Sequence, residues 1–262
     1  MNRPIGVFDS GVGGLTVVRA LREHLPNERI IYVGDTARAP YGGLSAETLL
    51  TYSRQIVRFL LNKDVKAVVL ACGTTSSTAY EALIAENPDI PMVDVIRPGV
   101  AAVERLANQR LGFIATVATV RKGLFARLLR EAYPDINIKS RACPLFAPMA
   151  EWGLFASAVT RWAAETYLRD WRGNIDALVL GCTHYPLLTD VLGEVLPNVY
   201  FVDLADETAK KTAERLREGG LLNDSSGPPL HEYYASGKPE IFGPIAEKIL
   251  GIPCKASKIN FK

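Results

Sequence analysis

Short runs of hydrophobic residues alternate along the chain with longer segments of helical periodicity. The runs are rich in valine and isoleucine, which is typical of strands buried on both faces of a parallel sheet. Strands are predicted near residues 5–8, 30–33, 67–71, 92–95, 111–115, 136–140, 177–181 and 199–202. Strands that alternate with helices indicate an α/β protein in which helices cover parallel sheets.

The segments between these strands carry helix signals. Leu15, Val18, Leu21 and Leu25 recur at helical spacing, and the pattern stops before Pro26, which cannot continue a helix. The segment 45–62 begins with Ser45, a residue type that caps helix N-termini. Another helix is predicted over 205–218.

The order of these elements repeats. The strand at 5–8 is followed by Cys72, and the strand at 111–114 is followed by Cys182 at a similar separation. The repeat predicts two pseudo-symmetric, doubly wound, flavodoxin-like domains, the first formed by residues 1–96 and 206–262 and the second by residues 97–205. Ligands of such sheets bind at the carboxyl ends of the strands, so we expect the site in the cleft between the domains.

Each half places a cysteine where a buried strand gives way to a polar turn, in VVLACGTTSS at 68–77 and LVLGCTHYPLL at 178–188. Amides at a helix start favour a thiolate, so we predict that the pKa values of Cys72 and Cys182 fall from about 8.5 toward neutrality. Two thiols on opposite faces of one molecule suit proton exchange at a carbon centre.

Other uses of these thiols are open at this stage. A disulfide between Cys72 and Cys182 would disable both groups, and a single nucleophilic Cys182 paired with His184 would leave Cys72 without a role. Metal binding by Cys72, Cys182 and His184 would rest on few ligands. The remaining cysteines, Cys143 and Cys254, are expected to be small buried hydrophobes.

Two further turns follow predicted strands. The glycines of FDSGVGG at 8–14 allow the backbone to approach a ligand, while Asp9 and Ser10 either contact that ligand or cap the next helix. The turn PYGG at 40–43 lies on the ligand side of a doubly wound sheet, which makes Tyr41 and Gly42 pocket candidates.

Composition narrows the class of protein. The chain has 30 lysines and arginines against 28 acidic residues, and they are dispersed, so the basic patch of a nucleic-acid-binding protein is not expected. No stretch has the eighteen or so uncharged residues needed to cross a bilayer, and no signal peptide is recognised, so we expect a cytoplasmic protein with free thiols.

The motifs IGVFDSGVGGLTV, YVGDTARAPYG, CPLFAP, LVLGCTHYPLL and YASGKPEIF together resemble glutamate racemase, in matching order over most of the chain. The resemblance implies a cofactor-independent enzyme of the Asp/Glu racemase superfamily that interconverts L- and D-glutamate and supplies D-glutamate for peptidoglycan in the bacterial cytoplasm. It also implies a homodimer.

The resemblance assigns roles residue by residue. It implies that Cys72 and Cys182 are the acid and base, assisted by Asp9, His184 and Glu151, although Glu151 also fits a solvated carboxylate at a helix start and threonines also fit helix caps. The residues that it places around the substrate are Asp9, Ser10, Tyr41, Gly42, Gly73, Thr74, Thr116, Thr119, Thr183 and His184.

One position departs from the family pattern. The family commonly reads Cys-Asn-Thr where this chain reads Cys72-Gly73-Thr74, so a side-chain amide beside the first thiol is missing. A compensating group such as Thr75 would preserve activity, whereas an uncompensated loss would leave a weakened homologue that binds or senses amino acids. Aspartate or a related acid is an alternative substrate, because no arginine clamp fixes the side-chain length.

Overall fold

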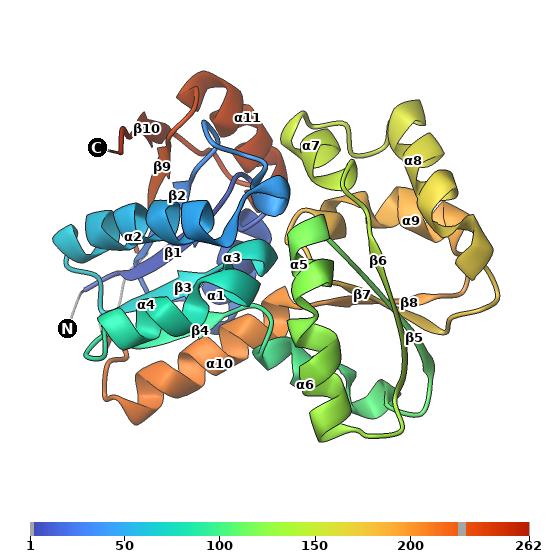
Figure 1. Ribbon diagram of the computed structural model, residues 1–262. Helices are drawn as coiled ribbons and strands as arrows, with labels where there is room; N and C mark the ends of the chain where they lie inside the picture. The colour runs from blue at the N-terminus through green and yellow to red at the C-terminus, as the bar shows by residue number, and fades with distance from the viewer. Residues whose placement is uncertain (1–2, 225–228, 262) are drawn as a thin grey trace.

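The chain folds into two parallel β-sheets with helices on their faces, as the computed structural model of residues 3–224 and 229–261 shows (Figure 1). The first sheet has the order β10-β9-β2-β1-β3-β4, and the second has the order β6-β5-β7-β8. The strands are β1 (Ile5–Asp9), β2 (Ile30–Gly34), β3 (Ala67–Leu70), β4 (Met92–Asp94), β5 (Arg110–Ala115), β6 (Asn137–Ala142), β7 (Ala177–Leu180), β8 (Tyr200–Asp203), β9 (Glu232–Ala235) and β10 (Ala256–Lys258).

The two sheets share one topology. In each, the first strand along the chain pairs in parallel with both the second and the third, and the fourth lies beside the third. The prediction of two pseudo-symmetric α/β domains is therefore confirmed. Cys72 follows β3 and Cys182 follows β7, so the two thiols occupy corresponding positions at the carboxyl ends of equivalent strands.

Helices connect the strands and cover both faces of each sheet. They are α1 (Leu15–His24), α2 (Ala46–Asn62), α3 (Gly73–Thr78), α4 (Tyr80–Glu86), α5 (Val117–Lys122), α6 (Leu124–Ala132), α7 (Phe146–Glu151), α8 (Ala158–Leu168), α9 (Thr189–Val195), α10 (Ala205–Glu218) and α11 (Pro239–Leu250), with the 3-10 helices η1 (Tyr41–Gly43), η2 (Pro98–Leu106), η3 (Arg169–Trp171) and η4 (Tyr185–Leu188). Ser45 caps α2 as predicted, because its Oγ accepts a hydrogen bond from the Thr48 amide at 3.1 Å.

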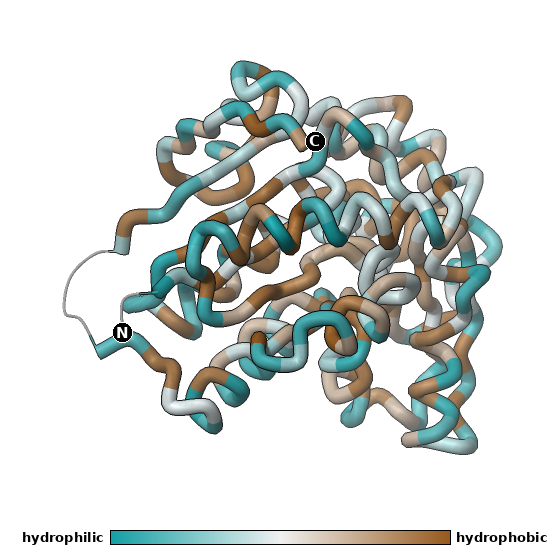
Figure 2. Tube along the Cα trace, turned by 60° about the vertical axis from the view of Figure 1, so that its left-hand side comes forward, coloured by the Kyte–Doolittle hydropathy of each residue, from teal (hydrophilic) through white to brown (hydrophobic). Residues whose placement is uncertain are grey.

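Alternate strand residues point to opposite faces, so each sheet supports two hydrophobic layers. One layer is continuous through the molecule and includes Val7 and Val69 of the first sheet together with Phe113 and Val179 of the second. Separate layers lie on the other faces, against α2 in the first half and against α8 and α9 in the second. Hydrophobic residues follow the central strands, while hydrophilic residues are frequent on the outer helices (Figure 2).

Two strands of the first sheet were not predicted from the sequence. β9 pairs in parallel with β2, and β10 pairs with β9 at the edge of the sheet. Both are short, and β10 reads Ala-Ser-Lys, so neither carries the run of valine and isoleucine that marks a central strand. They return the C-terminal part of the chain to the first sheet.

The strands divide into residues 5–94 plus 232–258 for the first sheet and 110–203 for the second. This distribution supports the predicted domain limits at 96/97 and 205/206, which stay a prediction. The outer limits at residues 1 and 262 lie outside the described residues, as do residues 225–228. In the part of the chain that is described, no helix combines the length and apolar character needed to span a membrane.

Candidate active site

A cavity of about 230 Å³ lies where the carboxyl ends of the two sheets face each other. It is smaller than the roughly 300–1,000 Å³ of pockets that hold drug-sized ligands, so it suits a molecule of amino-acid size. Turns from both halves contribute to its wall. The lining residues are Ser10, Ala39, Pro40, Tyr41, Gly42, Gly43, Cys72, Thr74, Thr116, Val117, Pro144, Ala147, Glu151, Cys182 and His184.

Four residues that the sequence placed around the substrate do not line this cavity: Asp9, Gly73, Thr119 and Thr183. They are buried directly behind residues that do. Asp9 precedes Ser10, Gly73 lies between Cys72 and Thr74, and Thr183 lies between Cys182 and His184. The Thr119 hydroxyl is 3.0 Å from the Thr116 hydroxyl. In this structure, they support the lining residues rather than face the cavity.

Cys72 is a free thiol with only 5% of its surface exposed. Burial raises its pKa to about 12, the negative charge of Asp9 adds to the increase, and the amide and hydroxyl of Thr75 oppose it. The expected lowering of the Cys72 pKa is therefore wrong, because desolvation and a neighbouring carboxylate outweigh the amide at the start of the six-residue helix α3. Cys72 is thus protonated at neutral pH in this structure, and its thiol points to the Ser10 hydroxyl at 3.9 Å.

Cys182 lies beside a histidine that is itself held by a carboxylate. His184 Nδ1 is 3.6 Å from Cys182 Sγ, and its Nε2 is 2.5 Å from Glu151 Oε1. Burial lowers the pKa of His184, but the hydrogen bonds to Cys182 and Glu151 outweigh burial and raise it well above its usual value. A protonated imidazole in this position donates one hydrogen bond to the carboxylate and points the other N–H at the sulfur.

Glu151 also joins the two halves of the molecule. Its Oε1 accepts a hydrogen bond from the Val12 amide at 2.7 Å as well as the one from His184. The turn after β1 has no side chain where this carboxylate enters, since a Cβ on Gly11 would lie 1.7 Å from Glu151 Oε1. A Cβ on Gly13 would lie 2.5 Å from His184 Nδ1. These two glycines, expected to admit a ligand, instead admit side chains of the second half.

Asp9 lies at the end of β1 and is fully buried. Its Oδ2 accepts a hydrogen bond from the Gly14 amide at 2.8 Å, while its Oδ1 has no partner. Burial raises the pKa of Asp9, and the nearby His184 partly opposes this. The α1 N-cap is Gly14, so Asp9 braces the turn before the helix rather than acting as its N-cap residue.

Hydroxyl groups from the two halves meet at the cavity wall. Thr74 Oγ1, on α3, is 2.9 Å from Thr116 Oγ1, which caps α5 by accepting from the Thr119 amide at 3.3 Å. Thr183 Oγ1 is buried without a partner, and its carbonyl accepts from Thr16 at 3.4 Å. The Tyr41 hydroxyl donates to Asp35, which fixes the ring against the cavity. The hydroxyls of Thr74 and Thr116, both of which line the cavity, are suited to hold polar groups of a ligand.

Part of the wall had no signal in the sequence. Pro144, Ala147 and Val117 are apolar residues without chemistry of their own, so only the fold identifies them as lining residues. Pro144 follows Cys143, whose carbonyl accepts from the buried Tyr185 hydroxyl at 2.8 Å. Burial raises the pKa of Cys143 above its ordinary range, so this thiol stays neutral.

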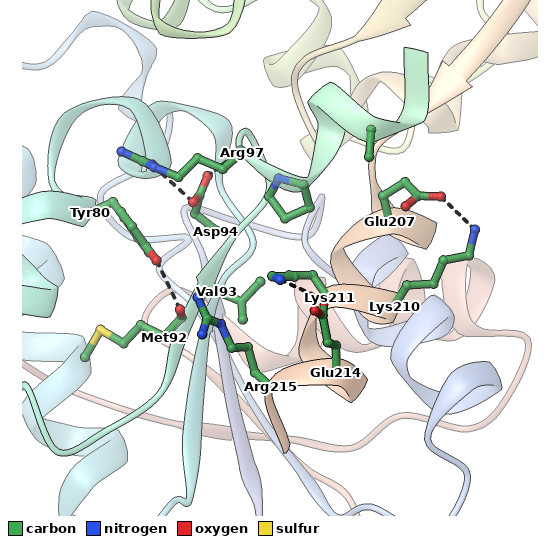
Figure 3. A pocket seen from close by; sticks show the side chains of 12 residues that line it. Tyr80, Met92, Val93, Asp94, Arg97, Glu207, Lys210, Lys211, Glu214 and Arg215 are labelled. Atoms are coloured by element: carbon green, nitrogen blue, oxygen red, sulfur yellow. Dashed lines mark hydrogen bonds and ion pairs between the residues drawn. The ribbon is translucent and has the colours of Figure 1, made fainter. Parts of the chain in front are cut away.

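A second hollow, of about 500 Å³, lies between α4, β4, η2 and α10 (Figure 3). None of its twelve described lining residues is a cysteine or a histidine. Several of its charged side chains pair with one another, as Arg97 does with Asp94 at 3.1 Å and Lys211 with Glu214 at 2.7 Å. The thiols of Cys72 and Cys182 therefore line the smaller cavity and not this hollow.

The four cysteines are free, so the thiols of Cys72 and Cys182 are not joined in a disulfide. Among the described residues, no group of three or more histidine, cysteine or acidic side chains is arranged to hold a metal ion. Cys72 and Cys182 are a pair of free thiols from equivalent turns. Cys72 has the carboxylate of Asp9 nearby, and Cys182 lies beside His184.

Comparisons with known proteins agree with this architecture. Residues 15–212 match the family described as Asp/Glu/Hydantoin racemase. A glutamate racemase of Neisseria meningitidis is 46% identical, over 95% of this chain and 93% of the relative. The crystal structure of glutamate racemase from Francisella tularensis in complex with D-glutamate has a TM-score of 0.91 and 37% identity, over 99% of this chain and 98% of that one.

The structure of Escherichia coli glutamate racemase in complex with L-glutamate and an activator has a TM-score of 0.81 and 29% identity, over 97% of both chains. Together with the two parallel-sheet domains, these similarities show that the protein is an amino-acid racemase, which is a type of isomerase. The chain belongs to the Asp/Glu/hydantoin racemase family.

Proposed function

We propose that the protein interconverts L- and D-glutamate without a cofactor, by exchanging the α-proton between two thiols. The observation that carries the proposal is the position of Cys72 and Cys182, two buried free thiols from equivalent turns that line one cavity. Relatives named for glutamate, including one with D-glutamate bound and one with L-glutamate bound, support the choice of substrate.

The proton balance closes without any other group. One cysteine, as thiolate, takes the α-proton from one face of glutamate and becomes a thiol, and the C–H electron pair stays on carbon as a carbanion-like centre. The other cysteine, as thiol, gives its proton to the opposite face and becomes a thiolate. The product has inverted configuration, and the enzyme is left in the form that reacts with that enantiomer.

The neighbours suggest how the two thiols differ. Cys72 is held as a thiol by burial and by Asp9, which suits a proton donor. Cys182 has the raised-pKa His184 at 3.6 Å, and an imidazolium at that distance stabilises a thiolate. We infer that Asp9 serves Cys72, while His184, held by Glu151, serves Cys182. For the opposite reaction the two cysteines exchange roles.

The α-proton is far less acidic than any thiol, so the site must stabilise the developing negative charge. A turnover near ~10 per second corresponds to a barrier of about 16 kcal/mol. Preorganised donors in a dry cavity supply such stabilisation. We assign substrate contacts to Ser10, Tyr41, Gly42, Thr74, Thr116 and His184 in the wall, with Asp9, Gly73, Thr119 and Thr183 behind them.

In the cell, we propose that this reaction takes place in the cytoplasm and supplies D-glutamate for peptidoglycan, and that the enzyme acts as a homodimer. The family resemblance supports these assignments. Sedimentation of the purified protein over a range of concentrations measures the oligomeric state directly.

The test of the function is α-hydrogen exchange in deuterium oxide without added cofactor. Both enantiomers of glutamate are expected to gain deuterium at the α-carbon and to convert into one another, because the proton delivered comes from a thiol that exchanges with solvent. The measurement is proton NMR of the α-position combined with chiral chromatography. Aspartate, run in parallel, is expected to react more slowly, since its shorter side chain leaves part of the cavity unfilled.

Absence of exchange with either glutamate enantiomer in the folded enzyme would reject the proposal. Faster exchange with aspartate would reassign the substrate. Binding of glutamate without exchange would instead support a weakened homologue that senses amino acids.

Replacement of Glu151 by glutamine tests whether the hydrogen bond between Glu151 and His184 sets the charge of the histidine. The raised pKa of His184 means that its imidazolium is present below that pKa and is lost as the pH rises through it. Glu151→Gln removes one contact that raises this pKa, so the loss of kcat/KM at alkaline pH is expected to begin about one to two pH units lower, from ~1.5–3 kcal/mol for a hydrogen bond to a charged group. The measurement is the pH profile of kcat/KM.

Glu165→Gln is the matched control, because Glu165 pairs with Arg172 in an exposed ion pair at 3.1 Å. Its profile should coincide with that of the unmodified enzyme. An unshifted profile for Glu151→Gln would show that the carboxylate does not set the charge of His184.

A further inference from the structure

The turn after β3 has no room for a side chain at position 73. A Cβ built on Gly73 would lie 2.4 Å from the carbonyl oxygen of Gly181, a backbone atom in the turn that carries Cys182. Contacts this short do not occur, and backbone yields less easily than the end of a side chain. The asparagine that the family resemblance predicts at this position therefore cannot enter while the two turns stay in contact. A polar side chain beside Cys72 must come from another position.

Helix α3 offers one hydroxyl without a partner. Ser76, Ser77 and Thr78 each donate to a backbone carbonyl, at 3.1, 2.8 and 2.7 Å, and Thr74 bonds to Thr116. Thr75 is 0% exposed, and its Oγ1 has no hydrogen-bond partner. A buried hydroxyl without a partner costs free energy on folding, so its presence calls for a role beyond stability.

The groups around Cys72 indicate what the Thr75 hydroxyl does. Burial is the main effect that opposes ionisation of Cys72. The negative charge of Asp9 at the end of β1 and the thiol of Cys182 in the facing turn add to it. Tyr32 and Tyr41 are close enough to be affected by the Cys72 charge, and both are held neutral by burial. The groups that favour the thiolate are the amide and the hydroxyl of Thr75. Ser10 at 3.9 Å accepts from the thiol form.

We propose that Thr75 is a further catalytic residue, whose hydroxyl donates a hydrogen bond to the Cys72 thiolate and so replaces the side-chain amide that Gly73 lacks. The hydroxyl is unpaired while Cys72 is a thiol, and it gains its partner when Cys72 loses the proton. In this step the S–H bond of Cys72 breaks and a C–H bond forms at the substrate α-carbon, whose own electron pair takes the proton, while the Thr75 proton stays on its oxygen. The inference rests on the proposed two-thiol function.

The test uses enzymes that keep only one of the two cysteines lining the cavity. In a Cys182→Ser background, Cys72 alone is expected to exchange the α-hydrogen of one glutamate enantiomer with deuterium without inverting it. Adding Thr75→Val removes the hydroxyl and keeps the shape, and it is expected to slow this exchange about 10- to 100-fold, the effect of one hydrogen bond to a charged group. Thr75→Ser, which keeps the hydroxyl, is expected to restore most of the rate.

A second readout does not depend on racemisation. Iodoacetamide reacts with the thiolate, so the alkylation rate of Cys72 at a fixed pH below its pKa follows the thiolate fraction. Thr75→Val is expected to lower this rate about 10- to 100-fold, as measured by mass spectrometry of the Cys72 peptide. Thr78→Val is the matched control on the same helix, because the Thr78 hydroxyl bonds to the Thr74 carbonyl, and it should change neither readout.

Unchanged exchange and unchanged alkylation in a folded Thr75→Val enzyme would overturn the proposal. A purely structural role predicts a lower melting temperature with normal alkylation, which would also overturn it. If Thr75→Val does not fold, Thr75→Ala provides the same comparison. Should the Cys182→Ser enzyme exchange neither enantiomer, the two-thiol function fails, while alkylation of Cys72 still decides the role of Thr75.

Discussion

Replacement of either Cys72 or Cys182 by serine is expected to lower kcat/KM for glutamate racemisation by roughly 10²–10⁴-fold, the usual contribution of a positioned acid or base. Serine keeps the size of the side chain but holds its proton too tightly to act as a base near neutral pH. Both variants are expected to lose inversion in both directions, because each direction needs one thiol on each face. The measurement is the rate of change of optical rotation from each enantiomer.

Cys254→Ser is the control for these variants. Cys254 is also a buried thiol, 5% exposed, but it lies beside α11 and not in the cavity. Its variant should racemise at the normal rate. Undiminished racemisation by the Cys72→Ser or the Cys182→Ser enzyme would exclude a two-thiol mechanism, whatever the structure of the cavity.

Replacement of Gly73 by asparagine is expected to lower kcat/KM by about 10²-fold, although asparagine is the residue that the family resemblance predicts at this position. The Cβ would meet the Gly181 carbonyl at 2.4 Å, so the turns that carry the two thiols must move apart. A misplacement of ~1 Å in an active site costs about 10²-fold in rate. Gly73→Ala introduces the same Cβ and is expected to show much of the loss. Steady-state kinetics with both enantiomers provides the measurement.

Gly193→Ala provides the comparison for Gly73→Ala. Gly193 lies in α9, and a Cβ there would meet only the Phe201 ring at 3.7 Å, an ordinary contact. This variant should keep its activity. A rise in activity for Gly73→Asn would mean that the natural site has decayed through loss of the amide, and it would favour the weakened-homologue alternative.

The central part of the fold could be predicted from the sequence. Strands β1 to β8 were all expected from the sequence, and all except the polar edge strand β6 contain a hydrophobic run between helical segments. The repeated order of these runs is enough to indicate two similar halves. The last two strands, β9 and the edge strand β10, escaped prediction because partial exposure removes the hydrophobic run. The pairing of β9 with β2, and of β10 with β9, depends on a return of the chain from distant residues, which no local pattern records.

The candidate site could be predicted in its residues but not in its electrostatics. The two cysteine motifs and the turn with Tyr41 lie in one cavity, as their positions after strands indicated. The direction of the Cys72 pKa shift was wrong because it depends on Asp9 and on complete burial, both set by tertiary packing. Glu151 fitted a solvated carboxylate in the sequence, yet it binds His184 and Val12.

The hydrogen bond between the Val12 amide and Glu151 links the orientation of His184 to the contact between the two halves of the molecule. Moving the two sheets apart to admit glutamate would pull Val12 from the carboxylate that also holds His184, so the histidine would lose its fixed orientation in an open enzyme. Proton abstraction would then be switched on only after the substrate is enclosed. Such an arrangement would keep the reactive carbanion from meeting bulk water, and it would make substrate entry and proton transfer successive events rather than independent ones.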